Sequence, residues 1–356
     1  MTTIHQFVPV ISHGDGVSGS AFYIRTLLRS LGYASDIYAW KSADALSDEV
    51  FPLNRFDSNS CDLLLVHHSM GHEQEDWLRA TTCKRTLVYH NITPYRYFDP
   101  GSNEYFYAIK GREQLRQWRP LFSSAISVSP YNRTDLEDAG YDDTVVMPLL
   151  LDVQRFEGDV EPPSASWRRR ENEILIVSVG RLVENKRQHV LLDAFWHLRK
   201  LHPERPARLI LVGGITSTAY HHQILARICE LGLEHEVTLT GKCPDAQLRW
   251  LYKHATLMWC ASEHEGFCIP LVEANFFCLP VVSFATSNIP DTLGESGLLI
   301  DDSNPITMAA TTVSLLKDKA LSQSLVRAGT ENLQRYNADT LIPRLRNYLE
   351  TRDIRP

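Results

Sequence analysis

Short apolar runs alternate with amphipathic stretches along most of the chain. In the first half the apolar runs have the length of buried strands, and between them apolar residues recur at helical spacing, as at 19–31 and 110–122. The predicted strands are 4–11, 35–40, 62–67, 85–90, 125–129 and 144–147. Strands that alternate with helices in this way predict a parallel sheet covered by helices on both faces.

This rhythm breaks at 152–172, a polar stretch that contains two adjacent prolines and three consecutive arginines and lacks periodicity. Such a composition is typical of a connection between domains. The alternation then resumes, with predicted strands at 174–180, 207–214, 237–241, 256–262 and 280–284 and predicted helices at about 186–201, 219–231, 244–254 and 270–278.

A length of 356 residues suits two domains of similar size. We therefore predict an α/β protein with two doubly wound, Rossmann-like domains: an N-terminal domain at 1–155, a linker at 156–172 and a C-terminal domain at 173–338. A terminal helix is predicted at about 339–356, and the sequence leaves open whether it packs back on the N-terminal domain.

Composition excludes several classes of protein. Apolar residues make up 44% and charged residues 22%, as in soluble globular proteins, and a net charge of −7 offers no electrostatic footprint for nucleic acid. The 7 cysteines are scattered and are expected to be free thiols in a reducing compartment. The N-terminus has no signal-peptide pattern and no apolar run is long enough to span a bilayer. We expect a cytoplasmic protein, with peripheral membrane contact and oligomeric state left open.

A glycine motif follows the first predicted strand. Gly14, Gly16 and Gly19 spell G-x-G-x-x-G, the pattern of a dinucleotide-binding turn, which also requires an acidic residue at the end of the second strand. Here Asp36 stands at the start of that strand and Lys41 at its end, so a nicotinamide cofactor is disfavoured. The loop can still bring backbone N–H groups to an anion, or it can be an ordinary tight turn.

The most informative stretch is SEHEGFCIPLVEANFFC at 262–278. Glu265 is expected on a loop after a strand, and Glu273 about one turn inside the following helix, because Pro270 suits a first helical turn. Paired carboxylates suit the hydroxyls of a sugar nucleotide, with Glu265 on the hexose and Glu273 on the ribose. The N–H groups of 267–269 at the helix N-terminus would then face the diphosphate. Two isolated glutamates would instead favour a solvated Glu273 and a capping Glu265.

A second stretch, GRLVENK at 180–186, supports the sugar-nucleotide interpretation. Arg181 directly follows a predicted strand, and Lys186 stands at a predicted helix start. A cation at a helix N-terminus opposes the helix dipole, which indicates a bound anion there. The alternative is a surface salt bridge.

GRLVENK followed by EGFCIPLVE resembles the retaining GT-B glycosyltransferases of family 4, glycosyl transferases group 1, especially bacterial members that act in polysaccharide assembly. Agreement extends through LVGG and LPVVSF, and more thinly through the N-terminal glycine loop and YHNITP. The resemblance implies an interdomain cleft, with the donor mainly on the C-terminal domain and the acceptor mainly on the N-terminal one.

The resemblance implies a role for each charged residue of the two stretches. Arg181 and Lys186 match the residues that hold the diphosphate, while Glu265 and Glu273 match the sugar-binding and ribose-binding glutamates. Gly16 matches the N-domain loop that approaches the donor phosphates. Phe267, Cys268 and Ile269 are further donor-binding candidates through their backbone N–H groups. The chain departs from the family pattern at His264, where tyrosine is usual, and at Cys268, where glycine is common.

The N-terminal half offers candidates for the acceptor side. His90 ends a predicted strand and resembles the family histidine that lies near the sugar; the alternative is a histidine merely packed there. Asn91 and Arg112 are acceptor-side candidates. Arg112, Arg116 and Arg119 recur on one face of a predicted helix, which is either ordinary or a basic face for anionic lipid or a diphosphate acceptor.

We therefore expect a retaining hexosyltransferase that needs neither a metal nor a cofactor. His67, His68 and His72 do not form a convincing set of metal ligands. The donor is a nucleotide sugar, with GDP-mannose weakly favoured, and the acceptor is a saccharide or a lipid-linked saccharide in polysaccharide or glycolipid synthesis. The alternatives are a non-catalytic sugar-nucleotide-binding subunit and a dinucleotide-dependent oxidoreductase.

Overall fold

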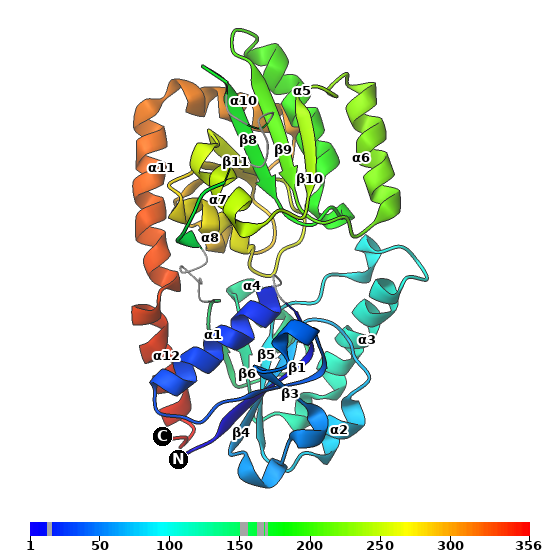
Figure 1. Cartoon of the computed structure of the whole chain (residues 1–356), viewed down its shortest axis with the longest axis vertical. Helices are drawn as coiled ribbons and strands as arrows, with labels where there is room; N and C mark the ends of the chain where they lie inside the picture. The colour runs from blue at the N-terminus through cyan, green and yellow to red at the C-terminus, as the bar shows by residue number, and fades with distance from the viewer. Residues whose placement is uncertain (13–15, 150–155, 162–166, 168–169) are drawn as a thin grey trace. The chain divides into compact units, whose positions relative to one another are not determined.

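The computed structural model of the chain describes residues 1–12, 16–149, 156–161, 167 and 170–356 (Figure 1). Gly14 lies outside these ranges, as do residues 162–166, 168 and 169 of the linker expected at 156–172. The chain divides into two compact units. Unit 1 comprises 1–152 together with 335–356, and unit 2 comprises 153–334.

Unit 1 is built on a parallel sheet of 7 strands in the order β3-β2-β1-β4-β5-β6-β7. Its strands are β1 Ile4–Ile11, β2 Ile37–Ser42, β3 Val50–Pro52, β4 Leu63–His68, β5 Lys84–Tyr89, β6 Ser124–Ser127 and β7 Thr144–Val146. Its helices are α1 Gly16–Ser30, α2 Glu75–Ala80, α3 Asn103–Gln117, α4 Pro130–Asp138 and α12 Ala338–Glu350.

Alternation along the central strands of unit 1 sends successive side chains to opposite faces of the sheet. Leu64 and Val66 of β4 join one core with α2, α3 and α4, whereas Leu63 and Leu65 join another with α1 and α12. Both faces are therefore covered by helices, as the apolar runs predicted.

Unit 2 repeats this plan on 6 parallel strands in the order β10-β9-β8-β11-β12-β13. Its strands are β8 Ile174–Val179, β9 Ala207–Val212, β10 Val237–Gly241, β11 Leu257–Cys260, β12 Val281–Phe284 and β13 Gly297–Ile300. Its helices are α5 Gln188–Leu201, α6 Thr218–Glu230, α7 Asp245–His254, α8 Ile269–Phe276, α9 Ile289–Leu293, α10 Pro305–Lys317 and α11 Lys319–Asn332.

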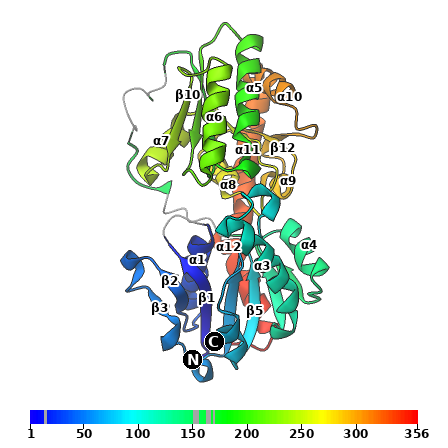
Figure 2. The same cartoon turned by 90° about the vertical axis from the view of Figure 1, so that its right-hand side faces the viewer.

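The helices of unit 2 form two layers on its sheet (Figure 2). Ile174 and Ile176 of β8 pack in a core with α5, α6 and α10, while Leu175 and Val177 pack in a core with α7, α8 and α9. The two sheets confirm the predicted fold class of two doubly wound, Rossmann-like α/β domains.

The last helix returns to unit 1 and packs beside α1. Leu345 and Leu349 of α12 are buried there, and the Tyr348 hydroxyl lies 3.0 Å from Thr86 Oγ1 of β5 and 2.6 Å from Ser124 Oγ of β6. The chain thus contributes its C-terminal residues to the N-terminal sheet, which the sequence had left open.

Several elements differ from those predicted. The short edge strand β3 was not predicted, nor were β13 and the three helices α9, α10 and α11. The helix expected at 110–122 spans 103–117 instead, because Ser102 caps its start by accepting a hydrogen bond from the Tyr105 N–H. Helix α1 begins at Gly16 rather than at 19.

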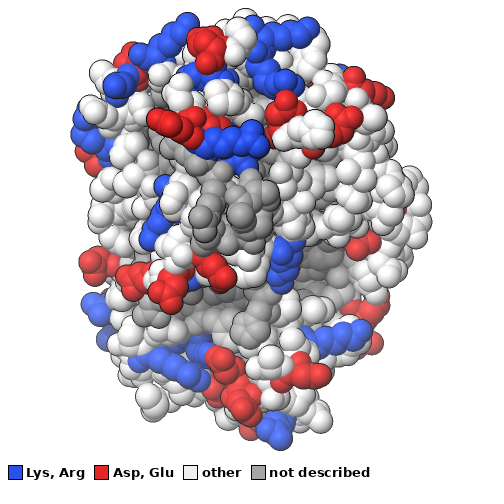
Figure 3. All heavy atoms as spheres, turned by 45° about the horizontal axis from the view of Figure 1, so that its top comes forward, with Lys and Arg blue, Asp and Glu red and all other residues white. Residues whose placement is uncertain are grey.

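Charged residues of both signs are interspersed over the face shown in Figure 3, in keeping with the modest net charge of −7. Among the described residues, none of the helices is long and apolar enough to cross a membrane.

Candidate functional site

Two loops meet at the carboxyl edge of the sheet of unit 2, one after β8 and one after β11. The first contains a short 3₁₀ turn, η8, at Glu184–Lys186. Asn185 fastens the loops together, because its Nδ2 donates to the His264 carbonyl at 3.0 Å and its own carbonyl accepts from the Glu263 N–H at 2.8 Å. The carboxyl edge of a parallel sheet is where α/β proteins bind ligands.

This fastening brings Lys186 and Glu265 into an ion pair. The two side chains retain 16% and 9% exposure respectively. Burial alone would lower the pKa of Lys186, but the Glu265 carboxylate outweighs it and raises that pKa. Burial likewise opposes ionisation of Glu265, and the Lys186 ammonium nevertheless holds the pKa of Glu265 below its usual value. Both groups are therefore charged.

The ion pair corrects one step of the sequence argument. Lys186 was expected at the start of the helix, but it lies in η8, and α5 begins at Gln188 after Arg187 in a left-handed conformation with φ 50°. The anion that balances the charge of Lys186 is Glu265. The helix dipole therefore does not by itself require a ligand at Lys186.

Helix α8 begins beside this ion pair. Cys268 is its N-cap residue and adopts a left-handed conformation with φ 70°, a position that glycine occupies without strain. Phe267 is held from behind, since its carbonyl accepts from the buried Thr292 hydroxyl. In the first turn of α8 Pro270 has no N–H and the Leu271 N–H donates to the Cys268 carbonyl at 3.1 Å. The Ile269 N–H and the helix dipole are therefore what this end of α8 offers to an anion.

Glu273 lies one turn inside α8 and is only 3% exposed. The Tyr252 hydroxyl of α7 donates to its carboxylate at 2.7 Å. Glu273 is therefore not a solvated glutamate, so the alternative considered from the sequence is wrong for this residue.

Arg181 follows β8 after one residue and is exposed. Among the described residues its guanidinium takes part in no recorded ion pair, so the alternative of a surface salt bridge finds no support there. Its carbonyl accepts from Gln188 Nε2 at 2.9 Å, which ties the loop to the start of α5. A cation placed this way is available to a ligand at the sheet edge.

A cavity of about 120 Å³, which was not predicted from the sequence, opens at the same edge. The ends of β8, β9 and β10 and the loops that follow them line the cavity, with Gly180, Gly213 and Gly241 among the lining residues. The glycine pair of LVGG contributes only to the family resemblance. Strand ends rich in glycine would have been the signal, because they leave room that side chains would fill.

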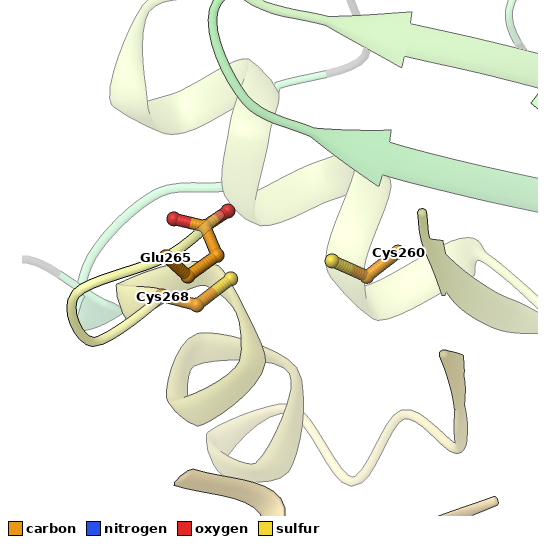
Figure 4. Close-up of side chains that lie close together, drawn as sticks. All are labelled: Cys260, Glu265 and Cys268. Carbon is orange, nitrogen blue, oxygen red and sulfur yellow. The ribbon is translucent and has the colours of Figure 1, made fainter. Parts of the chain in front are cut away.

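Two cysteine side chains converge on Glu265. Cys260 ends β11, and its sulfur points toward Cys268 and Glu265, which belong to the next loop and helix start (Figure 4). One ligand atom from each residue lies within 4.8 Å of the others. A hydrogen bond from the Cys268 thiol lowers the pKa of Cys260 to about 7, and the same contact raises the pKa of Cys268.

Thiolate and carboxylate groups are zinc ligands, and these three residues were not predicted from the sequence as a metal site. The Lys186 ammonium, however, already contacts the Glu265 carboxylate, and a second cation at the same oxygen atoms would be repelled. We therefore interpret Cys260 and Cys268 as residues that line the Lys186–Glu265 site, not as metal ligands.

In unit 1, the structure places Gly16 at the exposed first position of α1. His90 directly follows β5, and its Nε2 lies 2.8 Å from Nδ1 of His67 on β4. His68 and His72 are buried beside Trp118, with ring centroids 5.0 and 4.9 Å from it, and do not join His67 in a shared ligand set.

The loop after His90 is held by residues that were expected to contact an acceptor. Asn91 is buried with φ 82°, and its Nδ2 donates to Asn132 Oδ1 of α4 at 3.0 Å. Arg112 donates to the Ile92 carbonyl at 2.6 Å and lies 3.7 Å from Asp135. Both side chains therefore shape this loop from within unit 1.

The basic face expected from Arg112, Arg116 and Arg119 is not formed. Arg119 lies beyond α3, in a 3₁₀ turn at Arg119–Leu121, where it pairs with Asp142 at 2.6 Å. Since Arg112 is also engaged inside unit 1, Arg116 is the exposed member of the three. The proposed contact with anionic lipid headgroups loses its structural basis.

The buried histidines make unit 1 sensitive to acid. Burial lowers the pKa of His68 to about 4 and that of His72 and His90 to about 3. Between these values and the unfolded value near 6.5, the unfolded chain binds protons that the folded unit does not, so stability falls as the pH falls. Each such histidine lowers the free energy of unfolding by up to about 1.4 kcal/mol for every unit that the pH falls within this range.

We expect the opening free energy of β4 and β5, measured by amide hydrogen exchange, to decrease steeply from pH 6.5 to pH 4.5. His72→Asn keeps an acceptor for the Gln74 N–H and removes one titrating group, so its profile should be flatter. Substitution of the exposed His222 on α6 should leave the profile unchanged. A profile that is flat in the original protein would contradict neutral burial of these rings.

Residues 160–332 match the family model Glycosyl transferases group 1. The matched stretch lies within unit 2 and contains Arg181, Lys186, Glu265 and Glu273. The loops described above are thus the part of the chain that carries the likeness to this family, as the resemblance implied.

Curated relatives show the same likeness over part of their length. A D-inositol 3-phosphate glycosyltransferase from Corynebacterium diphtheriae is 31% identical over 204 residues, 55% of this chain and 47% of the relative. One from Thermobifida fusca is 35% identical over 141 residues, 38% of this chain and 32% of the relative. The matches span about half of these relatives' length or less.

Solved structures resemble the whole chain. Anabaena Alr3699/HepE, crystallised with UDP and glucose, has a TM-score of 0.75 at 18% identity, covering 99% of this chain and all of the other. WaaG, a glycosyltransferase involved in lipopolysaccharide biosynthesis, has a TM-score of 0.69 at 13% identity, covering 96% and 98% of the two chains. At these identities the similarity shows the fold, which is that of GT-B glycosyltransferases.

Proposed function

We propose that the protein is a glycosyltransferase that moves a hexose from a nucleotide sugar to a hydroxyl acceptor. The observation that carries this proposal is the buried Lys186–Glu265 ion pair at the carboxyl edge of unit 2, beside the N-terminus of α8 and inside the stretch that matches the glycosyltransferase family. A diphosphate at this place would meet Lys186, Arg181 and the N-terminus of α8 with its Ile269 N–H.

Each candidate has a role in this proposal. Arg181 and Lys186 stabilise the charge that grows on the departing diphosphate, and the donors at 267–269 add to it. Glu265 orients the hexose hydroxyls while it stays paired with Lys186, and Glu273, held by Tyr252, contacts the ribose. From the family resemblance, Gly16 is proposed to contact the donor phosphates and His90 the sugar.

We further propose that the configuration at the anomeric carbon is retained and that no metal is required. Retention is proposed from the family resemblance. In this mechanism the donor phosphate accepts the proton of the attacking hydroxyl. Glu265 is an unsuitable nucleophile because Lys186 already binds its carboxylate. Two cations and a helix N-terminus supply the positive charge that a metal would otherwise provide.

The donor base is proposed to be uracil, and the cavity of about 120 Å³ at the ends of β8, β9 and β10 is its proposed site. GDP-mannose, favoured weakly by the sequence, finds no support in the comparisons. Support for uracil comes from the crystal structures of HepE with UDP and with UDP-glucose.

Thermal denaturation with UDP, GDP and inorganic pyrophosphate tests the donor proposal. At about 100 times its dissociation constant a nucleoside diphosphate adds about 2.7 kcal/mol, so we expect UDP to raise the Tm by about 5–10 °C and GDP to raise it less. A larger rise with GDP would overturn the choice of base. No rise with either would overturn the donor site.

The acceptor is proposed to be a sugar-like polyol or saccharide, including lipid-linked ones. The relatives named D-inositol 3-phosphate glycosyltransferase support an inositol phosphate as the first compound to assay. A catalytically silent, sugar-nucleotide-binding subunit remains the second candidate. Slow release of UDP from a UDP-sugar by the purified protein would favour the enzyme over this alternative.

A further inference from the structure

Three polar side chains on neighbouring segments of unit 1 form a continuous line of hydrogen bonds. Gln6 lies on β1, His67 on β4 and His90 just after β5, and these strands are adjacent in the sheet. Gln6 Oε1 lies 2.9 Å from His67 Nε2, and His67 Nδ1 lies 2.8 Å from His90 Nε2. Gln6 and His67 are fully buried.

The far end of this line fixes the direction of every hydrogen bond. Gln6 Nε2 donates at 3.0 Å to the carbonyl of Ala21, which can only accept. The amide oxygen of Gln6 therefore faces His67 and can only accept, so His67 Nε2 must carry a proton. Flipping the amide would set its oxygen against the carbonyl oxygen of Ala21, where neither atom can donate.

The protonation of His67 in turn determines which ring nitrogen of His90 carries a proton. A neutral His67 that carries its proton on Nε2 has a bare Nδ1, which accepts the hydrogen bond from His90 Nε2. Burial, together with the neighbouring His90, holds the pKa of His67 well below its usual value, so His67 remains neutral. His90 then carries its proton on Nε2, and its own Nδ1 is bare.

That last nitrogen is left without a partner. His90 Nδ1 is a buried atom with no hydrogen-bond partner in the described part of the chain, although the residue as a whole is partly exposed. Buried acceptors are seldom left unsatisfied in native proteins. An acceptor screened from water also attracts a ligand donor more strongly than one that water already occupies.

We propose that Gln6 and His67 are positioning residues that hold His90 in its Nε2–H tautomer, so that His90 Nδ1 accepts a hydrogen bond from a hydroxyl of the bound saccharide. The inference rests on the proposed function for the saccharide and on unit 1 alone for the tautomer. It assigns His90 the role of an uncharged acceptor and excludes proton donation to the leaving group.

The tautomer can be measured without any activity. In protein labelled with ¹⁵N-histidine, long-range ¹H–¹⁵N correlation distinguishes protonated from bare ring nitrogens, and His90→Gln identifies the His90 signals. We expect a protonated Nε2 and a bare Nδ1 at pH 7. A proton on Nδ1, or a mixture of tautomers, would overturn the inference even if the protein transfers sugar normally.

Two substitutions at His67 separate positioning from packing. His67→Phe keeps a ring and removes the acceptor for His90, whereas His67→Asn offers an amide oxygen where Nδ1 was. We expect the phenylalanine variant to mix the His90 tautomers and raise a saccharide KM about three- to tenfold with a smaller effect on kcat. The asparagine variant should recover both readouts. Equal losses in the two variants would indicate a structural role and contradict the proposal.

The KM values of the His67→Phe variant show whether the hydroxyl that His90 binds belongs to the donor hexose or to the acceptor. If the donor hexose supplies it, the KM for donor rises in hydrolysis assays that contain no acceptor. If the acceptor supplies it, only the acceptor KM rises. A His67→Phe protein with scrambled tautomers and unchanged constants for both substrates would overturn the contact with saccharide. Gln6→Met, which removes the acceptor for His67 Nε2, should act in the same direction as His67→Phe.

Discussion

Replacement of Lys186 by methionine is expected to lower kcat/KM for the nucleotide sugar by about 10²–10³-fold, the usual cost of removing one group that stabilises transition-state charge. Methionine keeps the length of the stem that packs against Gly180, where a Cβ would lie 3.5 Å from Lys186 Cδ and Cε. The ammonium is therefore the main thing lost. Turnover of donor in the presence of a chelator measures the effect.

The single variant also leaves Glu265 buried without its partner, which destabilises a protein by about 3–5 kcal/mol. Lys186→Met combined with Glu265→Gln removes both charges and should recover much of that stability. We expect activity to stay low in the double variant, because the diphosphate still lacks its cation. Recovery of activity along with stability would show that Lys186 serves only the fold.

A matched control is available on the surface of the same unit. Lys253 lies in the last turn of α7 and is exposed. Lys253→Met changes the net charge of the protein as Lys186→Met does, and should leave kcat/KM within about twofold, since exposed charges contribute little.

Gly213→Ala is the second change with a large expected effect, and we predict that it lowers the free energy of unfolding of unit 2 by about 2–5 kcal/mol. Gly213 has φ +152°, and a Cβ there would lie 2.0 Å from the carbonyl oxygen of Gly180. That contact would push the backbone that leads into Arg181. Urea denaturation followed by a probe in unit 2 measures the loss.

The neighbouring glycine provides the control. A Cβ at Gly214 would have no atom within 4 Å, and its backbone is not in the left-handed region. We expect Gly214→Ala to be close to neutral. Because Gly213 lines the cavity of about 120 Å³, Gly213→Ala protein that remains folded should also bind UDP more weakly. Equal stability of the two variants would contradict the packing described for this edge.

Much of the fold was predictable because its strands are buried on both faces. Runs such as ILIVSVG at 174–180 and the spacing of the helices between them indicated two parallel sheets, and β8 and β10 begin where predicted. The short edge strand β3 has only three residues and escaped detection. Helices α10 and α11 were not predicted although Asn304 and Asp318 cap them, a signal that the sequence did contain.

The site was predicted in part, for reasons that particular residues make clear. Glu265 and Lys186 were both chosen, but not as an ion pair, because their contact depends on Asn185 fastening two loops that are far apart in sequence. The roles of Gln6 and His67 could not be inferred from sequence at all. Pairing between β1, β4 and β5 brings them to His90, and no local pattern encodes that pairing.

A crystal structure with UDP bound tests the central claim most directly. The account predicts a diphosphate within hydrogen-bond distance of the Lys186 ammonium and the Arg181 guanidinium, beside the N-terminus of α8, with the base in the cavity at the ends of β8, β9 and β10. A nucleotide bound elsewhere, with Lys186 and the start of α8 making no contact to it, would contradict the account.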